Sequence, residues 1–197
     1  MIIDEVHLLH DSRGPVLEAI VARTIRYIEQ TQNMIRIVAL SATLPNYREV
    51  ATFLRVREGK GLFYFDPSYR PVPLEQTFIG VTEKKPVRRM LLMNEILYEK
   101  VIERVKKDPY HQIIIFVHSR KQTAKTAKAL MDMAASKEEL DKFIASENSK
   151  LILESESKTA RDANLKELLP FGFAIHHAGM NRADRDLVEN LFGDRRV

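Results

Sequence analysis

Ile2-Ile3-Asp4-Glu5-Val6-His7 decides how the fold is interpreted, because an apolar pair runs directly into two acids. This pattern is typical of a buried parallel strand, and open α/β sheets bind ligands at the carboxyl ends of such strands. Phosphoryl transfer needs one carboxylate to hold Mg²⁺ and a second group to orient or deprotonate the attacking water. Asp4 and Glu5 fit these two roles. A solvated acidic turn after a strand is an equally good interpretation of these residues alone.

A second polar segment, Ser41-Ala42-Thr43, follows the apolar run 35–40. Its two hydroxyls can hydrogen-bond to a neighbouring carboxylate or histidine, and His7 is such a histidine. Ser/Thr loops are common after strands, so the segment is a weak signal by itself. Because it comes one helix and one strand after the acids, we expect both segments to meet at one edge of a sheet. A zinc site at His7 and His10 is disfavoured, because Glu5 precedes His7 and no His-Glu-x-x-His pattern is present.

The first 65 residues alternate between expected strands and helices. A helix begins at Pro15, Asn46 caps another that runs through Leu54, and 62–65 is a short strand. Residues 66–73 contain three prolines, which is typical of an extended linker. We therefore expect one unit over 1–65 and a second over 74–197.

The second unit has the same alternation. Its expected strands and helices are strand 74–81, helix 90–105, strand 112–117, a helix capped by Ser119, strand 171–175 and helix 182–192. Residues 137–168 are polar and resemble an insertion. Strands that alternate with helices predict parallel sheets, so the fold class is α/β in both units.

Composition narrows the class of protein. The chain has 197 residues, a net charge of +4 and no cysteine, which excludes disulfides, thiolate zinc sites and a cysteine nucleophile. The mild positive charge tolerates a polyanion without requiring one. No apolar run reaches the length of a membrane span. Because the sequence opens with a strand under way and closes on the turn 193–197, we expect an excised fragment.

Several stretches together resemble one family, and they occur in that family's order. They are Asp4-Glu5-Val6-His7, His7 to Glu18, Ser41-Ala42-Thr43-Leu44-Pro45, Arg70 to Gln76, Phe116-Val117-His118-Ser119-Arg120-Lys121, and Phe173 to Met180 followed by Arg182 and Arg185. The family is the superfamily II DExH-box RNA helicases of the large tandem-cassette type, and the likeness covers essentially the whole chain. It implies parts of two RecA-like domains joined by a Pro-rich linker.

The resemblance also implies roles for residues of the first unit. Asp4 would bind Mg²⁺ mostly through water, and Glu5 would activate the water that attacks the γ-phosphate of ATP. His7, Ser41 and Thr43 would couple the nucleotide state to movement of the second domain.

In the second unit the resemblance implies contacts with the RNA backbone. The residues concerned are Ser119, Arg120, Lys121, Gly179, Arg182 and Arg185. Hydroxyls, backbone amides and arginine forks suit phosphate contacts that do not read sequence. Simpler interpretations exist: Ser119 is also a helix N-cap, Arg182 and Arg185 could be solvated helix residues, and His176-His177 favours packing over metal binding.

Two family elements are missing. The phosphate loop needs Gly-x4-Gly-Lys-Ser/Thr, whereas the only Gly-Lys pair is Gly59-Lys60. The Gln-Arg-rich motif that supplies an arginine finger is also absent. ATP binding depends on backbone amides and a lysine around the phosphates, so this chain alone should neither bind ATP tightly nor hydrolyse it.

Within the family, the sequence resembles the spliceosomal branch more than the cointegrator-complex branch, through His118 to Lys121 and Pro73 to Gln76. That resemblance implies a nuclear protein whose partners are a small nuclear RNA duplex and spliceosomal proteins, with no membrane partner. The alternatives are a cointegrator-type DNA or RNA helicase and a cassette without catalysis that serves as a protein platform. Intact Asp4 and Glu5 disfavour the platform.

Overall fold

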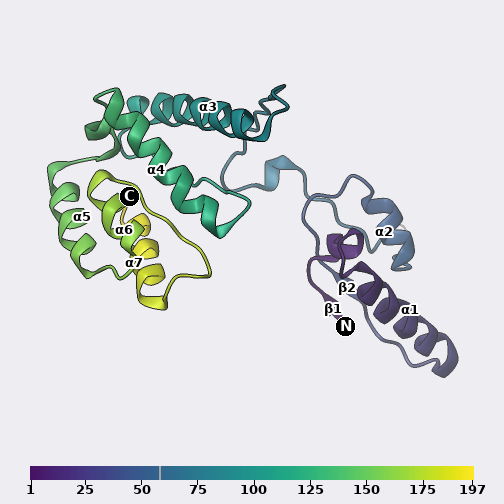
Figure 1. Ribbon diagram of the computed structural model, residues 1–197. Helices are drawn as coiled ribbons and strands as arrows, with labels where there is room; N and C mark the ends of the chain where they lie inside the picture. The colour runs from purple at the N-terminus through teal and green to yellow at the C-terminus, as the bar shows by residue number, and fades with distance from the viewer. Residues whose placement is uncertain (58) are drawn as a thin grey trace. The chain divides into compact units, whose positions relative to one another are not determined.

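The chain divides into two compact units, Met1–Thr77 and Phe78–Val197. The computed structural model describes residues 1–57 and 59–197. Each unit has its own hydrophobic core, and over the described residues the protein is mostly helical with one small sheet (Figure 1). None of the helices in these described residues is both long and apolar enough to cross a membrane.

The first unit contains a two-stranded parallel sheet. Its elements are β1 (Ile2–Ile3), the 3-10 helix η1 (Val6–His10), α1 (Gly14–Thr31), β2 (Val38–Ala39), α2 (Tyr47–Phe53) and the 3-10 helix η2 (Pro67–Tyr69). Ile2 pairs with Val38 and Ile3 with Ala39. The apolar face of α1 packs on this sheet through Val21, which has no exposed surface. Val21 belongs to the same hydrophobic cluster as the buried Ile3 and Val6.

A glycine is required where η1 turns into α1. A Cβ atom on Gly14 would lie 2.0 Å from the carbonyl oxygen of Leu9, a distance that no side chain tolerates. Pro15 follows in the first turn of α1, where its missing N–H group costs nothing. This tight junction holds η1, which carries His7, against the start of α1.

The second unit is a bundle of helices. Its elements are α3 (Pro86–Lys107), α4 (Arg120–Ser136), η3 (Leu140–Phe143), α5 (Glu147–Thr159), α6 (Ala163–Leu168), η4 (Leu169–Phe171) and α7 (Arg182–Gly193). The largest fully buried apolar side chains are Tyr98, Leu130, Leu153, Leu165, Leu168, Leu169 and Ile175. Val188 and Leu191 of α7 also belong to the core, which therefore draws on every helix from α3 to α7.

The polar stretch 137–168 contributes to this core. It forms η3, α5 and α6, and Leu153, Leu165 and Leu168 have no exposed surface. These three leucines fall on the inward faces of α5 and α6, whereas Leu151 on α5 is exposed. It is thus an integral part of the packed unit.

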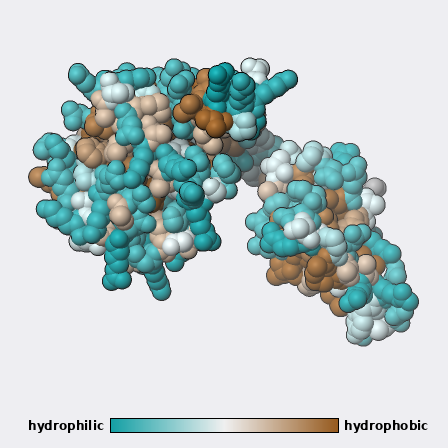
Figure 2. Space-filling model, viewed as in Figure 1, coloured by the Kyte–Doolittle hydropathy of each residue, from teal (hydrophilic) through white to brown (hydrophobic). Residues whose placement is uncertain are grey.

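Four of the expected strands do not form. Residues 62–65, 74–81, 112–117 and 171–175 are not hydrogen-bonded strands in the described parts of the chain. An extended segment becomes a strand only when its backbone pairs with a neighbour, and no backbone hydrogen bond joins these segments to one another. Several apolar side chains of the first three segments are exposed, such as Phe78 (89%) and Phe116 (93%), whereas Phe173 and Ile175 of the fourth segment are buried in the core. Apolar patches accordingly reach the surface of both units (Figure 2).

Candidate functional site

The acids and the 41–43 segment lie at the same edge of the small sheet. The N–H of Leu40 donates to the carbonyl oxygen of Ile3 at 2.9 Å, and the N–H of Val6 donates to the carbonyl oxygen of Leu40 at 2.9 Å. Both strands are parallel, so their carboxyl ends coincide. The expected meeting of the two segments is therefore present in the structure.

Glu5 has a strained backbone. Its φ of 59° and ψ of 46° lie in the left-handed region, where a non-glycine residue costs about 1–3 kcal/mol. This conformation turns the chain from β1 directly into η1. Residues with a strained backbone are frequent at functional sites, where contacts with the surrounding structure keep them in this conformation.

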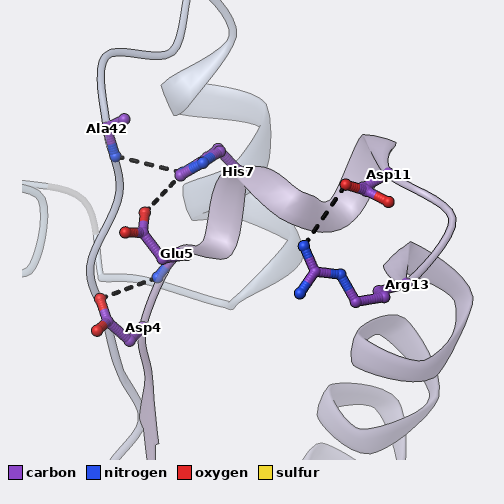
Figure 3. A network of polar contacts seen from close by, with 6 residues as sticks. All are labelled: Asp4, Glu5, His7, Asp11, Arg13 and Ala42. Atoms are coloured by element: carbon purple, nitrogen blue, oxygen red, sulfur yellow. Dashed lines mark hydrogen bonds and ion pairs between the residues drawn. The ribbon is translucent and has the colours of Figure 1, made fainter. Parts of the chain in front are cut away.

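His7 joins Glu5 to the 41–43 segment through a single ring nitrogen. Its Nδ1 lies 3.2 Å from Oε2 of Glu5 and 3.4 Å from the backbone nitrogen of Ala42 (Figure 3). With a proton on Nδ1, His7 donates to the Glu5 carboxylate; without it, Nδ1 accepts from the N–H of Ala42. The two contacts therefore need opposite protonation of the same atom.

The carboxylates of Asp4 and Glu5 are open to solvent. One oxygen of Asp4 accepts the N–H of Glu5 at 3.0 Å, which leaves the other free to bind a ligand. Hollows in the first unit lie elsewhere: one is lined by α1 and Phe53, another by Tyr47 and Tyr64. The acids thus stand on an open edge of the sheet, outside both hollows.

Ser41 and Thr43 are exposed, and neither hydroxyl has a hydrogen bond to another described residue. The contact between the two segments runs instead through the backbone N–H of Ala42. Sequence reasoning missed this residue, because an alanine carries no chemical signal and its contribution is a main-chain group.

In the second unit, two predicted segments lie side by side. Ser119 caps α4, since its Oγ accepts the N–H of Gln122 at 3.2 Å, so the predicted N-cap is confirmed. A Cβ on Gly179 would lie 3.5 Å from Cδ of Arg120 and 3.2 Å from Nδ1 of His177. The loop that contains Gly179 therefore packs against the start of α4, where the exposed Lys121 also lies.

The two arginines of α7 differ in their surroundings. Arg182 is highly exposed and pairs weakly with Asp186, with Nε 3.6 Å from Oδ2. Arg185 is half-buried, and its buried Nε has no hydrogen-bond partner among the described residues. The simpler alternative to RNA binding, a solvated helix residue, describes Arg182 but does not describe Arg185.

The His176-His177 pair shows no metal geometry. Nε2 of His176 lies 2.8 Å from Oε1 of Glu189, and Nδ1 of His177 accepts the N–H of Gly179 at 3.1 Å. No group of three or more acids and histidines that could hold a metal ion occurs in the part of the chain that the structure describes.

Asp184 is a buried acid that sequence reasoning did not single out. Only 2% of it is exposed, and its two carboxylate oxygens accept three hydrogen bonds. Burial raises the pKa of Asp184, but the N–H groups of Arg161 and Asp162 outweigh this effect, and the pKa lies below its usual value. The group is therefore held ionised inside the second unit.

The whole chain aligns with segments of large helicases. It is 59% identical over 198 aligned residues to the U5 small nuclear ribonucleoprotein 200 kDa helicase of Drosophila melanogaster, and the alignment covers 100% of this chain. The chain is thus similar over its full length to a spliceosomal DExH-box helicase. No protein-family model matches it.

Two other proteins align over the same full length of this chain. An Arabidopsis thaliana protein named DExH-box ATP-dependent RNA helicase DExH12 is 54% identical. A Dictyostelium discoideum protein named activating signal cointegrator 1 complex subunit 3-like is 57% identical. The chain spans 9% of the length of each of these relatives. The resemblance to large DExH-box helicases is confirmed.

Proposed function

We propose that this chain is part of an ATP-dependent RNA helicase that unwinds RNA duplexes in pre-mRNA splicing. The observation that carries the proposal is the junction of Glu5, His7 and Ala42 at the carboxyl ends of two parallel strands. The exposed carboxylates of Asp4 and Glu5 lie at this junction, and His7 is within 3.4 Å of both Glu5 and the backbone nitrogen of Ala42, which supports the proposal. In this proposal, residues 1–65 and 74–197 belong to two RecA-like domains, with 66–73 as their linker.

Asp4 and Glu5 have different roles in ATP hydrolysis. Asp4 keeps one carboxylate oxygen free, which suits Mg²⁺ because this ion retains several waters and binds proteins through one or two carboxylates. When bound, Mg²⁺ neutralises charge on the phosphate oxygens. Glu5 accepts the proton of the attacking water, and its left-handed backbone fixes the direction in which its carboxylate leaves the strand.

His7 reports the state of Glu5 to the 41–43 segment. While Glu5 is a bare carboxylate, a proton on Nδ1 of His7 is attracted to it. Once Glu5 has taken a proton from water, that attraction weakens; His7 then releases its Nδ1 proton to solvent, and the bare Nδ1 accepts the N–H of Ala42. Ser41 and Thr43 flank this N–H, so the loop that bears them changes its hydrogen bonding at the hydrolysis step.

The second unit supplies the RNA contacts. The N-terminus of α4, with Ser119, Arg120 and Lys121, lies next to the loop of Gly179. Helix N-termini and arginine forks both bind phosphate, and neither reads bases. Arg182 and Arg185 extend this surface along the first turn of α7. The expected partner is a small nuclear RNA duplex in the nucleus, together with spliceosomal proteins.

The test uses the full-length helicase that contains this segment. Glu5→Gln should abolish ATP turnover while nucleotide affinity stays unchanged, because the amide keeps the shape of the carboxylate but accepts no proton from water. Glu18→Gln, which changes an exposed acid on α1, is the matched control and should keep full turnover. Normal turnover in Glu5→Gln would refute the assignment. The 197-residue chain by itself should show no ATP turnover, since it lacks the phosphate loop.

A helicase of the cointegrator type is the second candidate, because the Dictyostelium discoideum relative bears that name at 57% identity. Unwinding assays with matched RNA and DNA duplexes separate the two candidates. Preference for RNA duplexes supports the splicing helicase, whereas equal or greater activity on DNA supports the cointegrator type.

A further inference from the structure

Asp184 ties two helices of the second unit together. Its Oδ1 accepts the N–H of Arg161 at 2.9 Å, and its Oδ2 accepts the N–H of Asp162 at 2.8 Å. Both donors lie in the turn between α5 and α6, more than twenty residues from Asp184 in sequence. The carboxylate therefore bridges the first turn of α7 and the beginning of α6.

Asn181 completes the bridge from the side of α7. It is the N-cap residue of α7: its Oδ1 accepts the N–H of Asp184 at 2.9 Å, and its Nδ2 donates to Oδ2 of Asp184 at 2.8 Å. In a capping box the acid three residues after the cap returns to the backbone of the cap residue. Here the acid reaches another helix instead, so the motif fixes the position of α7 as well as its start.

Asp162 extends the network into the core. Its side chain caps α6 by accepting the N–H groups of Asn164 at 2.8 Å and Leu165 at 3.1 Å. Leu165 has no exposed surface. The first turn of α7 is thus connected, through two part-buried hydrogen bonds, to the backbone of Leu165, whose side chain lies in the core of the second unit.

The hydrogen bonds of Asp184 come from amide groups, so Arg182 and Arg185 are not needed to neutralise it. Burying a carboxylate is costly unless donors replace its water, and here all the donors within hydrogen-bond distance are amide N–H groups. Neither Arg182 nor Arg185 forms an ion pair with Asp184 in the described structure. The two arginines are therefore not paired with the acid that lies between them in sequence.

We infer that Asp184 is a positioning residue for RNA binding: it holds the first turn of α7 so that Arg182 and Arg185 point at phosphates of the strand that passes Arg120 and Gly179. This inference rests on the proposed RNA-binding role of the second unit. Asp184 itself is buried and does not touch RNA.

The experiment measures binding of a fluorescent single-stranded RNA to the 197-residue chain by anisotropy, at several salt concentrations. The variants are Asp184→Asn, Arg182→Ala, and the two combined. The asparagine amide places a donor against one of the backbone N–H groups, which breaks the bridge at nearly constant volume. Glu139→Gln is the matched control, because Glu139 is also a hydrogen-bonded acid of this unit but contacts α3 and η3 residues, not α7.

Asp184→Asn should weaken binding about tenfold, the amount expected when Arg182 or Arg185 loses one charge-assisted contact with a phosphate. The slope of log affinity against log salt should also become shallower by about 0.7 for each phosphate contact that is lost. A general loss of stability would not change this slope. In the Arg182→Ala background the same change should have a smaller effect, because part of what it positions is already gone. Glu139→Gln should keep the slope of the unmodified chain.

Three outcomes would overturn the inference. Asp184→Asn could leave the salt slope unchanged, its effect could add fully to that of Arg182→Ala, or it could match Glu139→Gln in every respect. If Asp184→Asn does not fold, Asn181→Ala serves instead: it removes both the Nδ2 donor to Asp184 and the Oδ1 that caps α7, but it keeps the buried carboxylate and its bonds to residues 161 and 162, and it should give a smaller change of the same kind. If the unmodified chain does not bind RNA and Asp184→Asn is folded, the proposed RNA surface is rejected, and the inference is rejected with it.

Discussion

Replacing Leu153 by alanine tests whether α5 is part of the core. Leu153 is fully buried, whereas Leu151, two residues earlier on the same helix, is 61% exposed. The pair gives a matched comparison, because both substitutions remove the same atoms from the same helix and change helix propensity equally. Only the environment of the side chain differs.

The expected magnitude follows from burial. Leu→Ala removes three carbon groups, each worth about 0.8 kcal/mol when buried, or about 2.4 kcal/mol in total. The cavity left behind adds to this, so buried Leu→Ala changes cost about 2.7–5 kcal/mol. Leu153→Ala should therefore lower the free energy of unfolding of the second unit by about 3 kcal/mol. Leu151→Ala should change it by less than about 0.5 kcal/mol.

Hydrogen exchange followed by mass spectrometry is the suitable assay, because it reports on each unit separately. The most protected amides of α4 and α5 exchange through opening of the whole core, so a loss of about 3 kcal/mol speeds their exchange about a hundredfold. Amides of α1 in the first unit should not change. Circular dichroism at low temperature shows whether the variant remains folded.

Equal exchange in Leu153→Ala and Leu151→Ala would refute the reasoning. It would mean that α5 is held loosely, as a polar insertion would be, and that Leu153 contributes no packing energy. A hundredfold effect confined to α5 itself, with α4 unchanged, would show that α5 opens independently of the core.

Three further predictions concern single residues. Lys106 and Lys142 hold the pKa of Glu139 at about 2 through hydrogen bonds. The stability that ionised Glu139 contributes is complete above its unfolded pKa of about 4.3 and is lost as the pH falls through about 2. Glu139→Gln should therefore show a smaller fall in Tm over this pH range than the unmodified chain. Gly172 has a φ of 79°, and a Cβ there would lie 2.3 Å from the carbonyl oxygen of residue 143, so Gly172→Ala should cost more than about 1 kcal/mol in denaturant unfolding. His7→Phe in the full-length helicase should reduce RNA-stimulated ATP turnover at least about fivefold without weakening nucleotide binding, because it removes the shared nitrogen; unchanged stimulation would exclude His7 as the link.

Helix boundaries were predictable where a local signal marks them. Ser119 caps α4 as its position predicts, and α7 begins at Arg182 as predicted. Such signals act through hydrogen bonds within one turn, so a short window of sequence contains all of the information. At Asn46 the helix begins as predicted, but the asparagine side chain makes no capping hydrogen bond.

Strands were less predictable, because a strand depends on a partner far away in sequence. The apolar run 112–117 has the composition of a buried strand, yet its backbone is unpaired and Phe116 is 93% exposed. The reverse error occurred in 137–168, which was expected to be an insertion, because charged residues outnumber the few leucines on the inward faces. Whether an apolar residue is buried depends on what packs against it, and composition does not contain that information.

The first site was predictable as a set of residues but not as a set of contacts. The order of the acids and Ser41 to Thr43 correctly predicted that the two segments meet, since parallel strands share an edge. The contact made by the Ala42 backbone was not predictable, because every residue carries the same N–H group. Asp184 was hidden for a related reason: it lies among charged residues in a helix, where an acid is usually solvated.

The strain at Glu5 and the shared nitrogen of His7 explain each other. If Glu5 continued the strand in extended conformation, His7 would not fall two residues later on a tight 3-10 turn, and its ring would not reach Ala42 on the neighbouring strand. The left-handed turn costs about 1–3 kcal/mol. The contacts of His7 with Glu5 and Ala42 distinguish this edge of the sheet from an ordinary strand end. Left-handed backbone also occurs at Gln32, Arg55, Glu138 and Arg195, where it ends or follows a helix. What distinguishes Glu5 is the contact that its turn allows, because it brings Nδ1 of His7 to 3.4 Å from the backbone nitrogen of Ala42.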